Sequence, residues 1–140
     1  MRRVVVTGLG IVSSIGNNVD EVLASLKAGT SGIVASAEMA EHGFRSQIAG
    51  TLKLDITEHV EKRTLRFMGP AAAYAHIAMA QAIADAGLTE AEVVNERTGL
   101  VAGSGGPSTS AMLTAHQTVL KTGATKRIGP FAVPKCMSST

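Results

Sequence analysis

One alanine-rich segment constrains the fold of this chain more than any other part of its sequence. Residues 70–87 read PAAAYAHIAMAQAIADAG and contain nine alanines. The proline stands where a helix accepts proline as its first residue, and the closing glycine stands where helices commonly end. The polar residues Tyr74, Gln81 and Asp85 fall on one narrow stripe, so nearly the whole circumference of the helix is apolar. Such a helix is predicted to lie buried between layers of other elements.

The composition fits closely packed layers in one folding unit. A chain of 140 residues is long enough for one domain with a core and too short for two ordinary domains. Apolar residues make up 45% but aromatic residues only 3%, so the interior is built from small and medium aliphatic side chains. A net charge of +2 and the scarcity of aromatic side chains for base stacking predict no nucleic-acid partner.

The cysteine count and the apolar runs bear on the compartment. A single cysteine excludes an internal disulfide framework and favours a reducing compartment, so a cytoplasmic location is predicted. No apolar run approaches 18 residues, and glycines interrupt the first one, so neither a signal peptide nor a membrane span is predicted.

Strand, loop and helix signals alternate along the chain, which is typical of an α/β fold. Asn18 is predicted to cap a helix with Glu21 as its capping partner, because apolar residues follow at helical spacing and a glycine closes the run. The predicted elements are strands over 3–7 and 98–102, an alternating segment over 45–52, and helices over 19–28, 70–86, 107–121 and from Pro134 onward.

Two glycine-rich stretches invite comparison with nucleotide-binding loops. The opening RRVVVTGLGIVSSIG has Gly8 and Gly10, but Ser13 stands where the dinucleotide fingerprint needs its third glycine, and the helix begins only near Val19. A strand with a close-packed glycine turn is therefore favoured over a cofactor loop. The stretch GSGGPS over 103–108 has no following lysine, so it is interpreted as a turn lining a substrate cavity or a packed interface. No cofactor is predicted.

The cysteine and the histidines are weak catalytic candidates. Cys136 follows Pro134 by two residues, in the first turn of a predicted helix, where a thiolate would be favoured. A small residue at a close contact is the favoured alternative. His76 lies in the apolar helix and is interpreted as a core or interface histidine. The other histidines are His42, His59 and His116. The four histidines lack metal-ligand spacing, so no metal site is predicted.

Two basic clusters are candidates for binding a partner. Lys62, Arg63 and Arg66 are separated by apolar residues, and Lys126 with Arg127 forms a second cluster. If the two meet in space, they form an electropositive surface suited to an acidic partner. The alternative is that both clusters are simply solvated faces.

Four segments together resemble the N-terminal portion of the type I β-ketoacyl-acyl carrier protein synthases. They are RRVVVTGLGIVSSIGNNVDEVLASLKAGTSGI, LRFMGPAAAYAHIAMAQAIADAGL, GLVAGSGG and IGPFAVPKCMSST. The resemblance implies the thiolase-like layered fold (α-β-α-β-α), built from two similar halves in a homodimer. Residues 1–140 are then expected to be a single, incomplete domain that forms most of the N-terminal half of a longer protein.

The resemblance also implies an activity. Members of the family catalyse decarboxylative Claisen condensation in fatty acid elongation, in which an acyl group on an active-site cysteine is joined to malonyl-acyl carrier protein. The nucleophile and two catalytic histidines are implied beyond residue 140, so no catalytic residue is assigned here and the chain alone is expected to be inactive. Cys136 falls where the family has an ordinary small residue.

The remaining site residues come largely from the same resemblance. Lys62, Arg63, Arg66 and Lys126 fall at carrier-protein-binding positions, and Arg127 is added from its charge. The pair Gly106 and Met137 falls near positions that border the acyl pocket, with Met137 reaching across the dimer.

The sequence also departs from the family pattern. Pro107 shortens the GSGG loop, and MLTAHQTVLKTGATK differs from the family pattern, so the preferred acyl length is left open. A non-catalytic partner subunit resembling the chain-length factors, which share this fold, remains the alternative function. A dinucleotide-dependent dehydrogenase is the third possibility.

Overall fold

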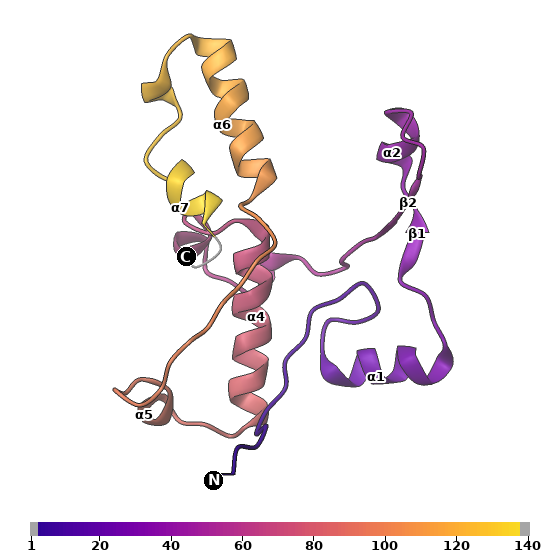
Figure 1. Ribbon diagram of the computed structural model, residues 1–140, viewed down its shortest axis with the longest axis vertical. Helices are drawn as coiled ribbons and strands as arrows, with labels where there is room; N and C mark the ends of the chain where they lie inside the picture. Colours follow the sequence, from indigo (N-terminus) through magenta and orange to yellow (C-terminus); the bar gives the residue numbers. More distant parts are fainter. Residues whose placement is uncertain (1–2, 138–140) are drawn as a thin grey trace. The chain divides into compact units, whose positions relative to one another are not determined.

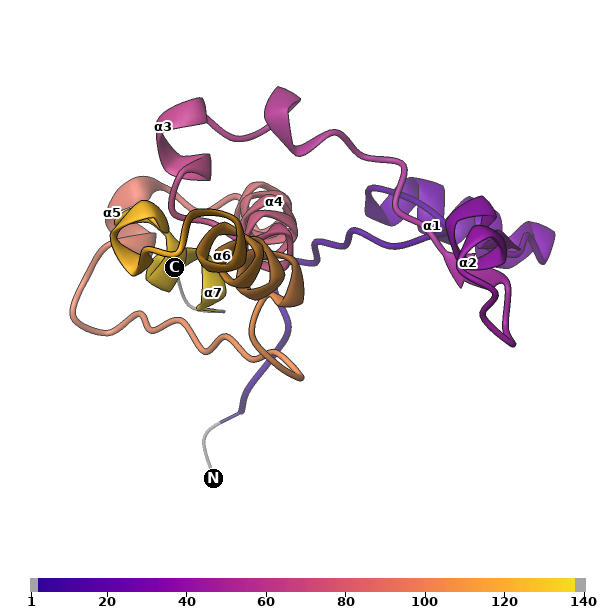
Figure 2. The same cartoon turned by 90° about the horizontal axis from the view of Figure 1, so that it is seen from above.

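The computed structural model describes residues 3–137, which divide into two compact units. The first unit comprises the described residues up to Leu54 together with Ala78–Leu88, and the second comprises Asp55–Ile77 with the described residues from Thr89 on. Figures 1 and 2 label most of the elements. In chain order they are α1 (Val19–Ala28), β1 (Ile33–Ala35), α2 (Ala37–Glu41), β2 (Ile48–Gly50), the 3-10 turn η1 (Ile56–Glu58), α3 (Lys62–Leu65), α4 (Pro70–Asp85), α5 (Glu90–Val93), α6 (Thr109–Thr122), the 3-10 turn η2 (Thr125–Arg127) and α7 (Ala132–Cys136).

Helix α1 begins and ends at the predicted signals. The Asn18 side chain accepts a hydrogen bond from the Glu21 backbone N–H at 2.9 Å, which satisfies one of the free donors of the first turn. Gly29 ends the helix in the left-handed conformation with φ of 66°, where a side chain would be strained. Val22 is the buried residue of this helix.

The sheet described in residues 3–137 is a single antiparallel pair. Strand β1 pairs with β2 in the register Ile33 to Gly50, and α2 lies in the connection between them (Figure 1). The alternating segment predicted over 45–52 therefore forms a strand at its centre. Ser36 extends the pairing, since its N–H donates to the Gln47 carbonyl at 2.8 Å.

Helix α4 forms as predicted, beginning at Pro70 and ending just before Gly87. Its predicted burial on all sides is wrong for the described chain. Ala73 and Ile77 are buried, with relative exposures of 0% and 6%, whereas Met79 is 41% exposed and His76 is exposed too. The described elements pack along only part of its circumference, so His76 is not a core residue here, and its interpretation as an interface histidine stays a prediction.

The predicted strand over 3–7 is not formed. These residues are extended, but no described strand lies beside them, and Val4 and Val6 are 91% and 80% exposed. A strand exists only where its N–H and C=O groups meet a neighbouring strand. An apolar run predicts a tendency to pair, and here the partner is missing from residues 3–137.

Polar side chains of α4 instead bind residues 9–17, the segment of the first unit that follows this apolar run. The N–H of Leu9 donates to the Asp85 carboxylate at 2.9 Å, and the N–H of Ile11 donates to the Gln81 side-chain oxygen at 3.0 Å. The Gln81 side-chain nitrogen in turn donates to the Asn17 carbonyl at 2.7 Å. The stripe therefore satisfies backbone groups that a sheet would otherwise satisfy.

The two glycines of the opening stretch allow this close approach. A Cβ atom on Gly8 would overlap the carbonyl oxygen of Ala82, and one on Gly10 would overlap that of Ala78. Both glycines thus serve packing against the α4 backbone, which agrees with the predicted close-packed glycine turn.

Several predicted elements of the second unit change. Residues 98–102 form no strand, and Val101 is 99% exposed, for the same lack of a described partner. Helix α6 begins after its cap Ser108 and not at Pro107, because the Ser108 side chain accepts from the third N–H of the helix. Pro134 lies inside the short α7 and not at its start, and the part of that helix predicted beyond residue 137 lies outside the described residues.

Candidate functional site

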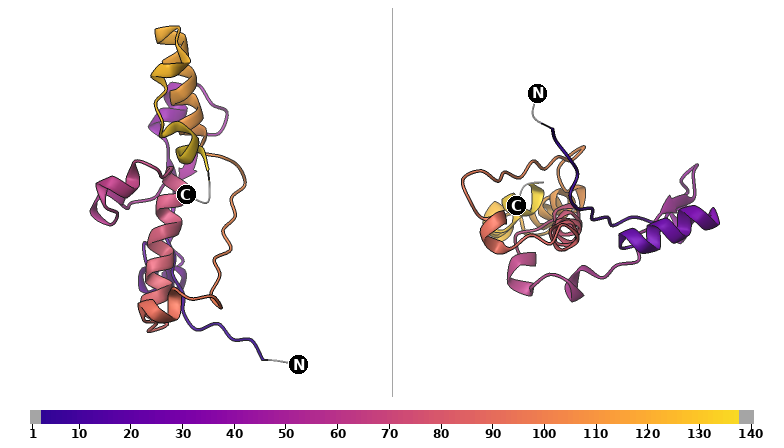
Figure 3. Two further views of the ribbon diagram at one scale, coloured as in Figure 1. Left: turned by 90° about the vertical axis from the view of Figure 1, so that its left-hand side faces the viewer. Right: turned by 90° about the horizontal axis from the view of Figure 1, so that it is seen from below.

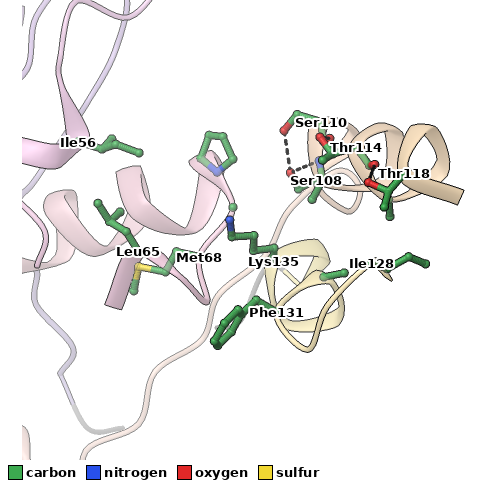
Figure 4. A pocket seen from close by; sticks show the side chains of 15 residues that line it. Ile56, Leu65, Met68, Ser108, Ser110, Thr114, Thr118, Ile128, Phe131 and Lys135 are labelled. Atoms are coloured by element: carbon green, nitrogen blue, oxygen red, sulfur yellow. Dashed lines mark hydrogen bonds between the residues drawn. The ribbon is translucent and has the colours of Figure 1, made fainter. Parts of the chain in front are cut away.

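A cavity of about 470 Å³ lies within the second unit, lined by residues of α3, the start of α4, α6 and α7. Figure 4 shows Leu65 and Met68 on one side of it and Ile128 and Thr118 on the other. Helix α6 contacts both η2 and α7, as two further views show (Figure 3). Elements far apart in the sequence therefore meet around one hollow.

The hydroxyl groups of the cavity are bonded within their own helix. The Thr114 hydroxyl donates to the Ser110 carbonyl and the Thr118 hydroxyl to the Thr114 carbonyl, both at 2.8 Å. Ser108 accepts from Ala111 as the helix cap. These hydroxyl protons are held by backbone carbonyls of α6, so the wall is polar but its threonine donors are already engaged.

The first basic cluster belongs to a turn that contributes one residue to the cavity lining. Lys62 and Arg63 belong to α3, Arg66 caps its C-terminal end, and all three side chains are exposed. Leu65, between the last two of them, lines the cavity. The same turn therefore directs an apolar side chain inward and cations outward.

The second basic cluster directly precedes another residue of the cavity lining. Lys126 and Arg127 form η2 and are exposed, and the next residue, Ile128, lines the cavity. Lys135 of α7, half-buried, adds a further cation to the lining. Each predicted cluster is thus next along the chain to a residue that lines the cavity of the second unit.

The predicted acyl-pocket residues lie elsewhere. Gly106 belongs to an exposed loop in which the Ser104 hydroxyl donates to the Gly106 carbonyl at 2.8 Å. Met137 follows α7 and is 50% exposed. Neither is among the described residues that line the cavity, so their role stays a prediction.

Cys136 does not occupy the position that the sequence predicts for it. It is the last residue of α7, half-buried, and its carbonyl accepts from the Ser108 N–H at 3.3 Å. A helix N-terminus therefore does not favour a thiolate at Cys136, because the residue lies at the C-terminal end of α7. Its backbone ties α7 to the start of α6.

Two carboxyl groups have perturbed acidity, and both cap helical turns. The Thr57 hydroxyl and N–H donate to Asp55 at 2.7 and 2.8 Å and lower the pKa of that carboxyl. The Thr89 N–H and hydroxyl likewise lower the pKa of Glu92. Hydrogen bonds to the charged form explain both shifts, since Asp55 caps η1 and Glu92 completes the capping box of Thr89.

The sequence-based prediction missed an aromatic contact beside the clusters. The rings of Phe67 and Phe131 meet edge to face, with centroids 5.1 Å apart and planes at 90°. The chain has only three phenylalanines, and one directly follows Arg66, which was the available signal. Pairing it with a residue more than sixty positions away required the tertiary structure.

The described chain holds no arrangement that points to a metal or a membrane. Across residues 3–137, no three His, Cys, Asp or Glu side chains gather as a metal site would require. None of the described helices combines the length and apolar character needed to cross a bilayer.

The similarity to known proteins identifies the family. Residues 1–140 match the family described as beta-ketoacyl synthase, N-terminal domain. The chain belongs to the β-ketoacyl synthase family. It is 55% identical over 140 residues to 3-oxoacyl-[acyl-carrier-protein] synthase 1 of Haemophilus influenzae, covering 100% of this chain and 34% of that protein. It is 49% identical to the synthase 1 of Escherichia coli K12, covering 99% of this chain and 34% of that protein.

Solved structures confirm the predicted fold class. A β-ketoacyl synthase from Burkholderia phymatum matches with a TM-score of 0.80 at 29% identity, over 99% of this chain and 35% of that one. The ishigamide ketosynthase/chain length factor matches with a TM-score of 0.81 at 28% identity, over 95% of this chain and 33% of that one. The chain spans about a third of the length of the curated relatives it matches.

Proposed function

We propose that the full-length protein is a condensing enzyme that elongates acyl chains held on acyl carrier protein. The observation that carries this is the identity of 55% over 140 residues to a 3-oxoacyl-[acyl-carrier-protein] synthase 1. The acyl group passes from the carrier thioester to an enzyme cysteine, and the carrier thiol leaves. Malonyl-carrier protein then loses carbon dioxide, and its carbanion attacks the acyl-enzyme, forming a carbon–carbon bond and returning the cysteine thiolate.

This chain contributes scaffold and docking surface, and the nucleophile and histidines are proposed to lie beyond residue 140. The chain alone is therefore inactive. The five exposed cations of α3, its C-cap Arg66 and η2 are proposed to bind the acidic carrier protein through opposite charge. In support, no ion pair within residues 3–137 engages their side chains. Gly106 and Met137 are proposed to border the acyl pocket. The protein is proposed to be a cytoplasmic homodimer in which Met137 reaches across to the neighbouring subunit.

The test uses the purified full-length protein with acyl- and malonyl-carrier protein. One 3-oxoacyl product should form for each carbon dioxide released. Charge reversal with Lys62→Glu and Arg66→Glu should weaken transfer from the carrier protein, more at low salt than at high salt, and leave hydrolysis of a small acyl thioester unchanged. Arg45→Glu, an exposed reversal in the first unit, is the matched control. Equal loss with both substrates would refute the docking role.

The alternative is a non-catalytic partner subunit of the same fold, which is less well supported than the synthase because the curated relatives are 3-oxoacyl-[acyl-carrier-protein] synthases. The same assay separates the two functions. A partner subunit would form no acyl-enzyme and no product alone, and would support turnover only when mixed with a competent synthase.

A further inference from the structure

The two basic clusters lie on elements too short to keep their own positions. Helix α3 spans Lys62–Leu65 and η2 spans Thr125–Arg127, four and three residues. Isolated turns of this length are unstable in water, because nucleation costs more than so few hydrogen bonds return. Their placement relative to one another therefore depends on tertiary contacts.

Helix α6 holds η2 and α7 together. It contacts both elements, and the Ser108 N–H at its start donates to the Cys136 carbonyl at the end of α7. Ile128, directly after η2, lines the cavity beside Phe131, which precedes α7. The second basic cluster is thus tied to the segment that carries Phe131.

Contacts of residues 67–69 tie the first cluster to the same segment. Phe67 directly follows Arg66, and its ring meets that of Phe131 edge to face, the geometry in which the positive ring edge faces the negative ring surface. Gly69 is buried, and a Cβ atom there would come within 2.6 Å of the Lys135 carbonyl. The chain after α3 therefore lies directly against α7.

We propose that Phe67 and Phe131 are positioning residues for carrier-protein docking, whose ring contact keeps the α3 and η2 clusters together as one basic surface. The proposal rests on the proposed function. Both rings lie partly at the surface, 44% and 36% exposed, so they are not the filling of a core. Their truncation should leave the fold intact and loosen the spacing of the charges on either side.

The test measures binding and turnover separately in the full-length protein. The dissociation constant for acyl carrier protein and the KM for the acyl-carrier substrate should rise about twofold to tenfold in Phe67→Leu and in Phe131→Leu, the span expected for one aromatic pair. The kcat and the turnover of a small acyl thioester should not change. Phe67→Tyr, which keeps the ring, should bind the carrier protein as the unmodified protein does.

Two controls separate positioning from general destabilisation. The double variant of Phe67 and Phe131 should be no weaker than the worse single variant, because both changes remove the same contact. Phe44→Leu, which truncates an exposed ring of the first unit, should leave binding unchanged.

The possible results distinguish the positioning role of Phe67 and Phe131 from the proposed condensing activity. Unchanged carrier binding in both leucine variants, or additive losses in the double variant, would overturn the positioning role even if the enzyme condenses normally. So would an equal loss with the small thioester. If the unmodified protein makes no 3-oxoacyl product while the leucine variants still bind carrier protein less tightly, the proposed function fails and the positioning role stands.

Discussion

Replacing Gln81 with leucine should detach the extended N-terminal segment of the first unit from α4. Leucine fills a similar volume but offers neither a donor nor an acceptor. The change removes the 3.0 Å bond from the Ile11 N–H and the 2.7 Å bond to the Asn17 carbonyl, both partly buried. Two backbone groups of the segment then lose their partners at once.

The expected cost follows from those two groups. A buried backbone donor or acceptor left without a partner costs about 1–3 kcal/mol, and water can reach these sites in part, so the total should be about 2–4 kcal/mol. A loss of that size should speed hydrogen exchange of the segment about 30-fold to several-hundred-fold, since about 1.4 kcal/mol corresponds to a factor of ten.

Hydrogen–deuterium exchange of the full-length protein checks this directly, read from peptides covering residues 8–17. The urea midpoint at fixed protein concentration gives the global change. Gln81→Glu keeps the acceptor for the Ile11 N–H and loses only the donor, so it should fall between wild type and leucine. Met79→Leu, at an exposed position of the same helix, is the control and should change stability by less than about 0.5 kcal/mol.

Unchanged exchange of residues 8–17 in Gln81→Leu would contradict this prediction. It would mean that the close contact of the glycines with α4 holds the segment without the side-chain amide. A uniform increase in exchange across the whole protein would also count against it, because the predicted effect is local to this segment.

Two further predictions concern the second unit. Gly69→Ala should lower the free energy of unfolding by about 1–3 kcal/mol, because the new Cβ would meet the Lys135 carbonyl at 2.6 Å. Gly99→Ala, with open space around it, should be nearly neutral. The shift of the urea midpoint measures both changes, and equal effects would contradict the packing argument. Glu92 should titrate below its ordinary value of 4.5, and carboxyl carbon NMR should show the pKa rising in Thr89→Val. Because the folded pKa is lowered, the capping contribution should be complete above about pH 4.5 and lost as the pH falls through the lowered value, and an unshifted titration would contradict this.

Local chemistry made several elements predictable from the sequence. Asn18 and Gly29 bound α1 because a cap needs only one side chain and one conformation near the helix end. The proline that opens α4 acts in the same way. The basic clusters were also evident from charge alone, since they required only short spacings along the chain.

Contacts between distant residues were not predictable in the same way. The strands predicted over 3–7 and 98–102 failed because apolar pattern describes a surface to be covered and does not supply the partner that covers it. The narrow polar stripe of α4 predicted only that the rest of the helix is apolar, whereas Gln81 on this stripe binds the N-terminal segment. Cys136 changed from the first turn of a helix to the last residue of one because α7 begins before Pro134.

The family, the well-capped helices and the charges available for docking were predictable without the fold, because they depend on local residue order and on similarity along the chain. The folded structure was needed to show that Leu65 of α3 and Ile128 after η2 line one cavity and that Phe67 meets Phe131. Such pairings join segments more than sixty residues apart, and nothing in local sequence chemistry selects one distant partner over another.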